Sequence, residues 1–221
     1  TAGALLASPA NPTGTLLDDD VLAAIASFVR QQGGQLIVDE IYHGLSYERD
    51  ASTALQFGDD IFVVQSFSKY FNMTGWRLGW LVIPERFSRD IEKLAQNLFI
   101  SPSAPAQHAA LAAFAPATIS ILEARRQEFR RRRDFLGPAL TELGFRLPAR
   151  AEGAFYLYAN CSELTDDSER FAHDLLDATG VAATPGLDFG SNAPEKHLRF
   201  AYTTGVERLA EAAERIRRYL G

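Results

Sequence analysis

A lysine, two serines and an arginine stand close together where an apolar run of the sequence ends. Ser66, Ser68 and Lys69 follow Ile61–Val64, and Arg77 comes eight residues after the lysine. A lysine amine that has lost its proton condenses with an aldehyde, and hydroxyl groups together with a guanidinium bind phosphate. This spacing therefore favours a site for a phosphorylated aldehyde over a solvated strand end.

Further polar side chains follow the other apolar runs. Asn11 comes after Ala4–Ala7, and Asp39 and Tyr42 come after Leu36–Val38. Taken one at a time, a turn-forming asparagine, a solvated carboxylate and a half-buried tyrosine are the commoner explanations. Taken together and in this order they indicate one site, because ligands collect at the carboxyl ends of strands in doubly wound sheets.

The elements that would carry these residues alternate between strand and helix. Short runs that are apolar throughout are typical of strands covered on both faces. The strands are predicted at 4–7, 36–38, 61–64 and 78–83, and the helices between Asp18 and Gly33, near 85–99 and over 104–114. Strand, helix, strand, loop, strand in this order predicts an α/β fold.

Beyond these elements the pattern changes. A long helical pattern runs from about Ala117 to Leu143 and is interrupted by Gly137-Pro138. Short strand candidates then alternate with two helical segments. The strand candidates are 145–147, 154–159, 181–183 and 197–202, and the helices are about 168–179 and 205–220. These segments predict a smaller α+β unit.

Five stretches of the chain resemble the successive signatures of fold-type-I, class I/II pyridoxal-phosphate aminotransferases. They are SPANPTG, VDEIYHGLSY, SFSKYFNMTGWRLGW, PGLDFG and LRFAYTT, in the family's order and over nearly the whole chain. The SxSK motif with an arginine eight residues on is a specific signal, whereas NPTG alone is weak. The resemblance implies an enzyme that moves an amino group between an L-amino acid and a 2-oxo acid through a pyridoxal 5'-phosphate Schiff base on Lys69.

The resemblance also assigns roles around the cofactor ring. The residues that would hold the cofactor are Asn11, Asp39, Tyr42, Ser66, Ser68, Lys69 and Arg77. Asp39 would keep the pyridine nitrogen protonated, so that the ring can accept electrons. Asn11 and Tyr42 would bond the phenolic oxygen of the ring.

The remaining roles concern phosphate, proton and substrate. Ser66 and Arg77, with Ser68, would bind the phosphate. Lys69 would be the catalytic residue and would shuttle the proton from the substrate Cα. Arg199, in LRFAYTT, would bind the substrate α-carboxylate together with Asn11.

Members of the family have a substantial N-terminal part that this chain lacks, so the chain resembles their C-terminal part only. We expect 1–115 to be the C-terminal portion of the cofactor-binding large domain, with part of its three-layer α/β/α sheet. We expect 116–136 to be a linking helix and 137–221 a small C-terminal α+β domain. Alone, the chain is expected to bind cofactor weakly or not at all and to be inactive, since part of the site would be missing.

Two alternatives share these motifs. A carbon–sulfur lyase or a decarboxylase of the same fold would use the same cofactor residues, and it would release its products without a 2-oxo acid acceptor. A transcription regulator with an aminotransferase-like sensor domain would carry a DNA-binding module in the sequence that precedes Thr1. The residues of this chain leave both open.

The composition of the chain disfavours several other classes of protein and of binding site. The chain has 221 residues, 47% of them apolar, and a net charge of −6, which disfavours nucleic-acid binding. No apolar stretch is long enough for a membrane helix, and the four histidines lack metal-ligand spacing, so no membrane partner and no metal are expected. The single cysteine excludes an internal disulfide framework. We expect a cytoplasmic protein, a homodimer when intact, with amino acids and 2-oxo acids as partners.

Overall fold

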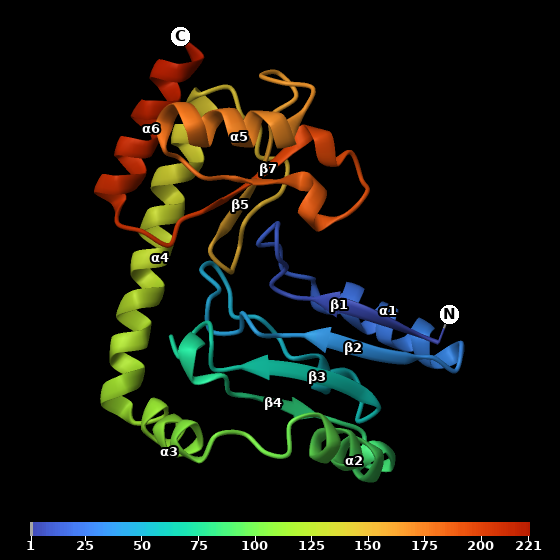
Figure 1. Ribbon diagram of the computed structural model, residues 1–221. Helices are drawn as coiled ribbons and strands as arrows, with labels where there is room; N and C mark the ends of the chain where they lie inside the picture. Colours follow the sequence, from blue (N-terminus) through green and yellow to red (C-terminus); the bar gives the residue numbers. More distant parts are fainter. Residues whose placement is uncertain (1) are drawn as a thin grey trace. The chain divides into compact units, whose positions relative to one another are not determined.

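A four-stranded sheet forms the centre of the first of two units in the computed structural model, which describes residues 2–221 (Figure 1). This first unit comprises the residues up to Ala10 together with Leu16–Arg126. The second unit comprises Asn11–Thr15 and Gln127–Gly221. The division falls inside the long helix α4 (Pro116–Glu142), and a short segment from near the start of the chain belongs to the second unit.

The strands of the first unit lie side by side in chain order: β1 (Gly3–Ala7), β2 (Gln35–Asp39), β3 (Ile61–Ser66) and β4 (Gly79–Val82). The first three are parallel, and β4 runs antiparallel to β3. Parallel neighbours need a crossover connection, which α1 (Asp19–Gln31) supplies between β1 and β2. The α/β fold predicted from the sequence is confirmed.

One face of this sheet is buried under α1. Leu22 and Ala26 of the helix share a hydrophobic cluster with Leu36, Val38 and Val63 of the strands. These positions alternate along their strands, as expected when only one face packs on the helix.

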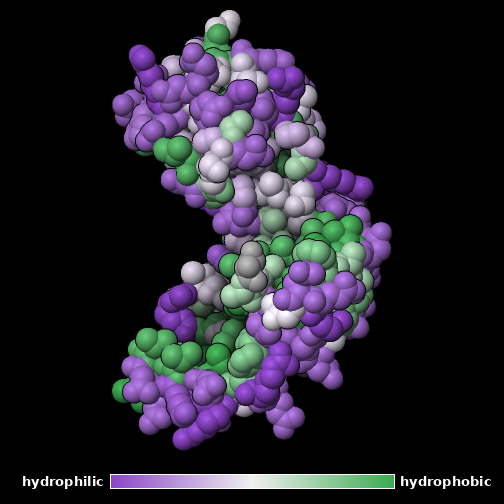
Figure 2. All heavy atoms as spheres, turned by 90° about the vertical axis from the view of Figure 1, so that its right-hand side faces the viewer, coloured by the Kyte–Doolittle hydropathy of each residue, from purple (hydrophilic) through white to green (hydrophobic). Residues whose placement is uncertain are grey.

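The opposite face of the sheet is much more exposed. Leu5, Ile37 and Leu81 have 72%, 37% and 54% of their surface accessible. The strand register puts the three on one face, because Leu5 pairs with Ile37 and the alternation continues to Leu81. In Figure 2, patches of green mark hydrophobic side chains on the surface of this unit.

Two helices follow β4: α2 (Ser88–Leu98) and α3 (Ala104–Ala113). The small side chains of α3 at Ala106, Ala110 and Ala113 form a second cluster with Phe67, Met73 and Leu78. This cluster supports the loop between β3 and β4, which carries the predicted lysine and arginine. The sequence predicted one helix over 85–99, and the structure has a short 3-10 turn, Glu85–Phe87, before α2.

The second unit is built on a three-stranded antiparallel sheet with the order β5-β7-β6. Its strands are β5 (Tyr156–Asn160), β6 (Thr184–Pro185) and β7 (His197–Ala201), and its helices are α5 (Ser168–Thr179), α6 (Val206–Leu220) and the second part of α4. Buried side chains such as Leu175, Leu198 and Ile216 form its core. The smaller α+β unit predicted from the sequence is confirmed.

The long helix differs from its prediction, because Gly137-Pro138 does not interrupt it. Pro138 lies inside α4 and is exposed, while its neighbours Leu136 and Leu140 are buried. A proline inside a helix removes one backbone hydrogen bond and costs about 3 kcal/mol. Burial of the two leucines, at roughly 2 kcal/mol each, offsets that cost and keeps the helix continuous.

Two short strand predictions in this unit were wrong. Phe145–Leu147 is no strand but holds an isolated bridge between Arg146 and Asn160. The segment 181–183 precedes β6, which consists only of Thr184–Pro185. Apolar runs of three residues resemble strands in sequence, and Phe145 is buried without belonging to the sheet.

Candidate active site

The carboxyl ends of β2 and β3 carry two of the predicted residues. Asp39 ends β2 and pairs with Val64, and Ser66 ends β3 and pairs with Gly79. Side chains two residues apart on a strand share a face, so Ser66 lies on the same face as Val64 and Asp39. Both polar residues therefore stand at one edge of the sheet, on the face away from α1.

The loop after β3 brings Arg77 next to two serines. The backbone nitrogen of Ser68 donates to Ser66 Oγ over 3.0 Å, and Arg77 Nη1 lies 3.5 Å from Ser68 Oγ. Thr74 links the two parts of the loop: it accepts from Arg77 Nη1 at its carbonyl (2.9 Å), and its hydroxyl donates to the Ser68 carbonyl (2.7 Å). We call Ser66, Ser68 and Arg77 the anion cradle, because their hydroxyls and guanidinium can all donate to one phosphate.

The backbone at Arg77 is strained. Its φ of 52° and ψ of 53° place it in the left-handed region, which costs a residue other than glycine roughly 1–2 kcal/mol. Two backbone hydrogen bonds close the loop around it, from Phe67 N to the Leu78 carbonyl and from Met73 N to the Phe67 carbonyl, each 3.0 Å. Strain that the surroundings hold in place is frequent at ligand sites.

Lys69 lies in the same loop and is half-buried. Its amine is 5.4 Å from the centre of the Tyr42 ring, and Tyr42 itself is buried. The face of an aromatic ring attracts a cation, so Tyr42 restricts where the amine can go. Two residues that the sequence placed on different strand ends are thus brought together.

Tyr70, the next residue of this loop, packs against the turn that follows Tyr42. A Cβ added to Gly44 would lie 2.5 Å from Tyr70 Cγ, so only glycine lets the turn after Tyr42 come so close. The Tyr70 hydroxyl donates to Glu123 Oε1 over 2.6 Å. Burial, and then this hydrogen bond, raise the pKa of Tyr70 to about 12. Tyr70 therefore stays protonated and anchors the loop that holds Lys69.

Glu40, next to Asp39, is a buried carboxylate with 1% of its surface exposed. Its Oε1 accepts from Ala54 N (2.7 Å) and from Thr53 Oγ1 (3.1 Å). Its Oε2 accepts from Gln65 Nε2 (3.1 Å) and lies 3.4 Å from His43 Nδ1. Gln65 and His43 are sequence neighbours of Ser66 and Tyr42, so Glu40 ties together the segments that carry the site.

His43 completes this buried network. Burial lowers the pKa of His43, and the neighbouring Glu40 carboxylate opposes that shift only in part. Its Nε2 is buried and makes no hydrogen bond within residues 2–221. The imidazole is therefore neutral near pH 7.

The second unit holds Arg199, in the middle of β7. Its Nη1 donates to Asn11 Oδ1 over 2.7 Å, and its Nη2 donates to Thr184 Oγ1 over 3.3 Å. Its Cζ lies 4.2 Å from the centre of the Tyr156 ring and 4.7 Å from that of Phe189. We call this arrangement the Arg199 clamp. A guanidinium fixed between two rings is preorganised to bind a carboxylate with two parallel hydrogen bonds.

The predicted residues fall into these two groups. The first unit holds six of them, Asp39, Tyr42, Ser66, Ser68, Lys69 and Arg77, and the second unit holds Asn11 and Arg199. The sequence interpretation missed Glu40, because it assigned a role only to the neighbouring carboxylate, Asp39. The signal was present in the alternation of Leu36, Val38 and Glu40, which places the carboxylate on the buried face.

A metal cluster and a membrane-spanning helix are both absent from the part of the chain that the structure describes. Residues 2–221 contain no cluster of three or more histidines, cysteines and acidic residues arranged to hold a metal ion. None of their helices is both long enough and apolar enough to cross a membrane. Cys161 is buried, and burial raises its pKa to about 11, so its thiol is protonated at neutral pH.

Comparison with known protein families identifies the family to which the chain belongs. Residues 1–216 match the family described as aminotransferase class I and II. The chain belongs to this family. The resemblance drawn from its five motifs is confirmed, and the match runs through both units.

Several curated members of the aminotransferase family are similar to the chain. It is 40% identical to a valine–pyruvate aminotransferase of Mycobacterium tuberculosis over 99% of its length. It is 36% identical to an aspartate/prephenate aminotransferase of Thermus thermophilus over its whole length. In both comparisons it covers 57% of the relative, so the chain spans a little over half the length of these aminotransferases.

Solved aminotransferase structures have the same fold. A crystal structure of an aminotransferase from Mycobacterium tuberculosis superposes with a TM-score of 0.95 at 40% identity, covering 99% of this chain and 57% of that one. The aspartate aminotransferase of Thermus thermophilus with maleate gives a TM-score of 0.92 at 36% identity, covering 99% and 56%. The fold-type-I aminotransferase architecture predicted for this chain is confirmed.

Proposed function

We propose that the protein is a pyridoxal-phosphate-dependent aminotransferase that moves an amino group between an L-amino acid and a 2-oxo acid. The observation that carries the proposal is the loop between β3 and β4. It places the Lys69 amine over Tyr42 and the anion cradle in the same short segment. Membership of the aminotransferase family supports the same reaction class.

The residues of the first unit fit this cofactor chemically. Two hydroxyls and a guanidinium suit its phosphate, and the Asp39 carboxylate stands on the same sheet face as Ser66. When bound, the cofactor supplies an aldehyde that condenses with amines and a protonated ring that accepts electrons from the substrate Cα. No other amine than that of Lys69 lies in this loop.

Each residue then has a defined task. Lys69 anchors the cofactor through its amine and moves a proton at the substrate Cα. Asp39 holds the proton on the ring nitrogen, and its Oδ1 already accepts from Ile41 N over 3.0 Å, which fixes the carboxylate. Tyr42 donates to the phenolic oxygen of the ring.

We assign the substrate α-carboxylate to the Arg199 clamp. Asn11 holds Arg199 with its side-chain oxygen, so its amide nitrogen can donate to substrate or to the cofactor's phenolic oxygen. Thr184 and the two flanking rings keep the guanidinium in one orientation. The clamp recognises a group that all amino acids share, so it does not select a side chain.

Covalent trapping tests the central assignment. The chain has three lysines, Lys69, Lys93 and Lys196, so peptide mapping can assign an adduct without ambiguity. The chain alone is expected to bind the cofactor weakly, so the experiment uses a large excess of pyridoxal phosphate, and we expect borohydride reduction to label Lys69 in preference to the other two. Lys69→Ala should abolish this label, whereas Lys93→Ala, which removes an exposed lysine 3.8 Å from Asp90, should leave it unchanged. Equal labelling of the three lysines would contradict the proposal.

Turnover by the longer protein tests the reaction type. An aminotransferase needs a 2-oxo acid acceptor, and Lys69→Ala should abolish multiple turnovers. Release of ammonia and pyruvate from a cysteine conjugate without an acceptor would instead indicate a lyase. We also propose that the chain comprises a cofactor domain, a linking helix and a small domain, and that the intact protein is a cytoplasmic homodimer. Its mass in solution by light scattering checks the dimer.

A further inference from the structure

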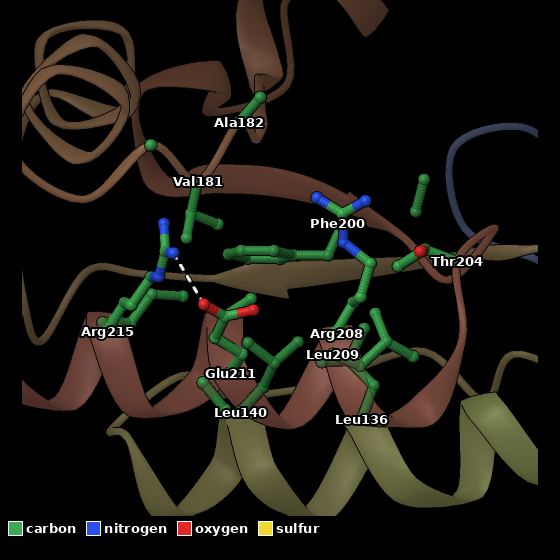
Figure 3. Close-up of a pocket in the computed structure, with 15 residues that line it drawn as sticks. Leu136, Leu140, Val181, Ala182, Phe200, Thr204, Arg208, Leu209, Glu211 and Arg215 are labelled. Carbon is green, nitrogen blue, oxygen red and sulfur yellow. Dashed lines mark hydrogen bonds and ion pairs between the residues drawn. The ribbon is translucent and has the colours of Figure 1, made fainter.

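A pocket of about 280 Å³ lies in the second unit, away from every residue assigned above. Its walls come from α4, α6, β7 and the segment that follows α5 (Figure 3). Ligand pockets for drug-sized molecules span roughly 300–1,000 Å³, so this pocket suits a smaller molecule.

The floor of the pocket is hydrophobic. Phe200 lies flat across it between Val181 and Arg208, and Leu136, Leu140 and Leu209 are close by (Figure 3). Phe200 and the three leucines are buried, so the floor is part of the folded core and is formed before any ligand arrives.

The pocket is separate from the Arg199 clamp. Arg199 and Phe200 are consecutive on β7, so their side chains point to opposite faces of the sheet. Leu198 and Phe200 face the helices and are buried, whereas Arg199 faces Asn11 and Thr184. A ligand over Phe200 therefore occupies the opposite face of the sheet from the clamp.

The charges around the pocket do not cancel. Its lining contains Arg208, Arg215 and Glu211, and Arg215 Nη2 pairs with Glu211 Oε1 over 2.6 Å. Arg208 makes no side-chain hydrogen bond and no ion pair within residues 2–221, although the other arginines of α6, Arg217 and Arg218, pair with Glu214. One unneutralised guanidinium thus extends over a hydrophobic floor (Figure 3).

We propose that this pocket binds a small monocarboxylate with a compact branched or aromatic hydrocarbon group. Its carboxylate would pair with Arg208 and its hydrocarbon part would cover Phe200. The hydroxyl of Thr204, at the same end of the pocket as Arg208, offers a further hydrogen bond (Figure 3). The lining has a net charge of plus one, and Glu211 repels a second negative charge, so monocarboxylates bind in preference to dicarboxylates.

Nuclear magnetic resonance of the full chain can test this proposal with 3-methylbutanoate as the probe. We expect saturable shifts of the Val181, Thr204 and Ala212 amides, with a dissociation constant in the millimolar range, as suits so small a ligand. The neutral 3-methylbutanamide should bind roughly tenfold more weakly, because it forms no charged hydrogen bond with Arg208. Acetate, which lacks the branched group, should also bind more weakly.

Four variants separate this pocket from other carboxylate sites. Arg208→Gln should weaken 3-methylbutanoate roughly tenfold, whereas Arg217→Gln, on the same helix outside the pocket, should not. Ala182→Phe should block the pocket from its exposed rim without entering the core. Arg199→Gln should leave binding intact, so the outcome does not depend on the proposed reaction. Shifts confined to the surroundings of Arg199, unchanged affinity in Arg208→Gln, or no saturable shift would each overturn the proposal.

Discussion

Glu40 illustrates how much one buried carboxylate can determine. Its two oxygens contact four groups from three segments of the first unit, and none of these contacts involves the predicted catalytic residues themselves. A buried charge is stable only when its hydrogen bonds are satisfied, so its partners have to keep their positions. Glu40 is therefore a positioning residue for Asp39, Tyr42 and Ser66.

Glu40→Gln should destabilise the chain by about 2 kcal/mol. The amide nitrogen of glutamine is a donor, and it would replace a carboxylate oxygen that accepts hydrogen bonds from donor groups. Urea unfolding measures this loss. Glu92→Gln is the matched control: Glu92 is 71% exposed and 3.5 Å from Arg89, so its loss should cost less than about 0.5 kcal/mol. Equal effects of the two changes would show that the Glu40 network contributes little.

His43 makes stability depend on pH. Burial lowers its pKa in the folded chain below the ordinary 6.5, so the unfolded chain binds the proton more tightly. The stabilisation is therefore complete above about pH 6.5 and is lost as the pH falls from there towards the lowered value. Urea midpoints measured from about pH 7.5 to about pH 5 should show this decline, and His43→Asn should reduce its slope. His173→Asn, at an exposed position of α5, should leave the slope as it is.

At the scale of elements, α4 contains a proline at a position where helix geometry disfavours proline. Pro138 is exposed, so its ring contributes little packing to set against the hydrogen bond that it removes. Pro138→Ala should raise the unfolding free energy by about 1 kcal/mol or more. Pro116→Ala should change it little, because proline is well tolerated in the first turn of a helix. Thermal unfolding of the two variants compares the positions directly, and a loss of stability in Pro138→Ala would mean that the ring packs after all.

The same elements show which features a sequence can predict. Strands β1 to β4 were predictable because each is a short apolar run bounded by turn residues, and α5 because Asp167 caps its start and Gly180 ends it. The error at Gly137-Pro138 came from local propensity, which tertiary burial of Leu136 and Leu140 overrides. The short strand β6 has only two residues and no pattern of its own, so only its pairing with β7 defines it.

Prediction of the site from the sequence likewise depended on whether the residues in contact are close together in the sequence. Lys69 and Arg77 were identified from their spacing because both lie in one loop. The contact between Asn11 and Arg199 joins positions 188 residues apart, and no local pattern encodes such a contact. Arg208 is one of several arginines on α6 in the sequence, and only the structure shows that it lacks a carboxylate partner among residues 2–221.

At the scale of the whole molecule, the exposed sheet face of the first unit is the dominant feature. Leu5, Ile37 and Leu81 form part of a hydrophobic surface larger than scattered exposed residues would give. We expect the chain to associate as its concentration rises. Leu81→Lys should shift the sedimentation coefficient towards the monomer, whereas Leu176→Lys, at an exposed leucine of α5, should not. A chain that stays monomeric at high concentration would contradict this expectation.

The antiparallel pairing of β4 with β3 also bears on how the protein tolerates changes in length. Ser66 pairs with Gly79, so the segment 67–78 is closed by the sheet at both ends. Every cradle donor and the Lys69 amine lie in this segment or next to it. The hydrogen bond from Phe67 N to the Leu78 carbonyl holds the two ends of the segment together. An inserted or deleted residue there would keep the sheet but change the direction of Arg77 or Lys69. Related chains should therefore vary in length elsewhere, for example in the exposed turn at 48–50, and keep this segment constant.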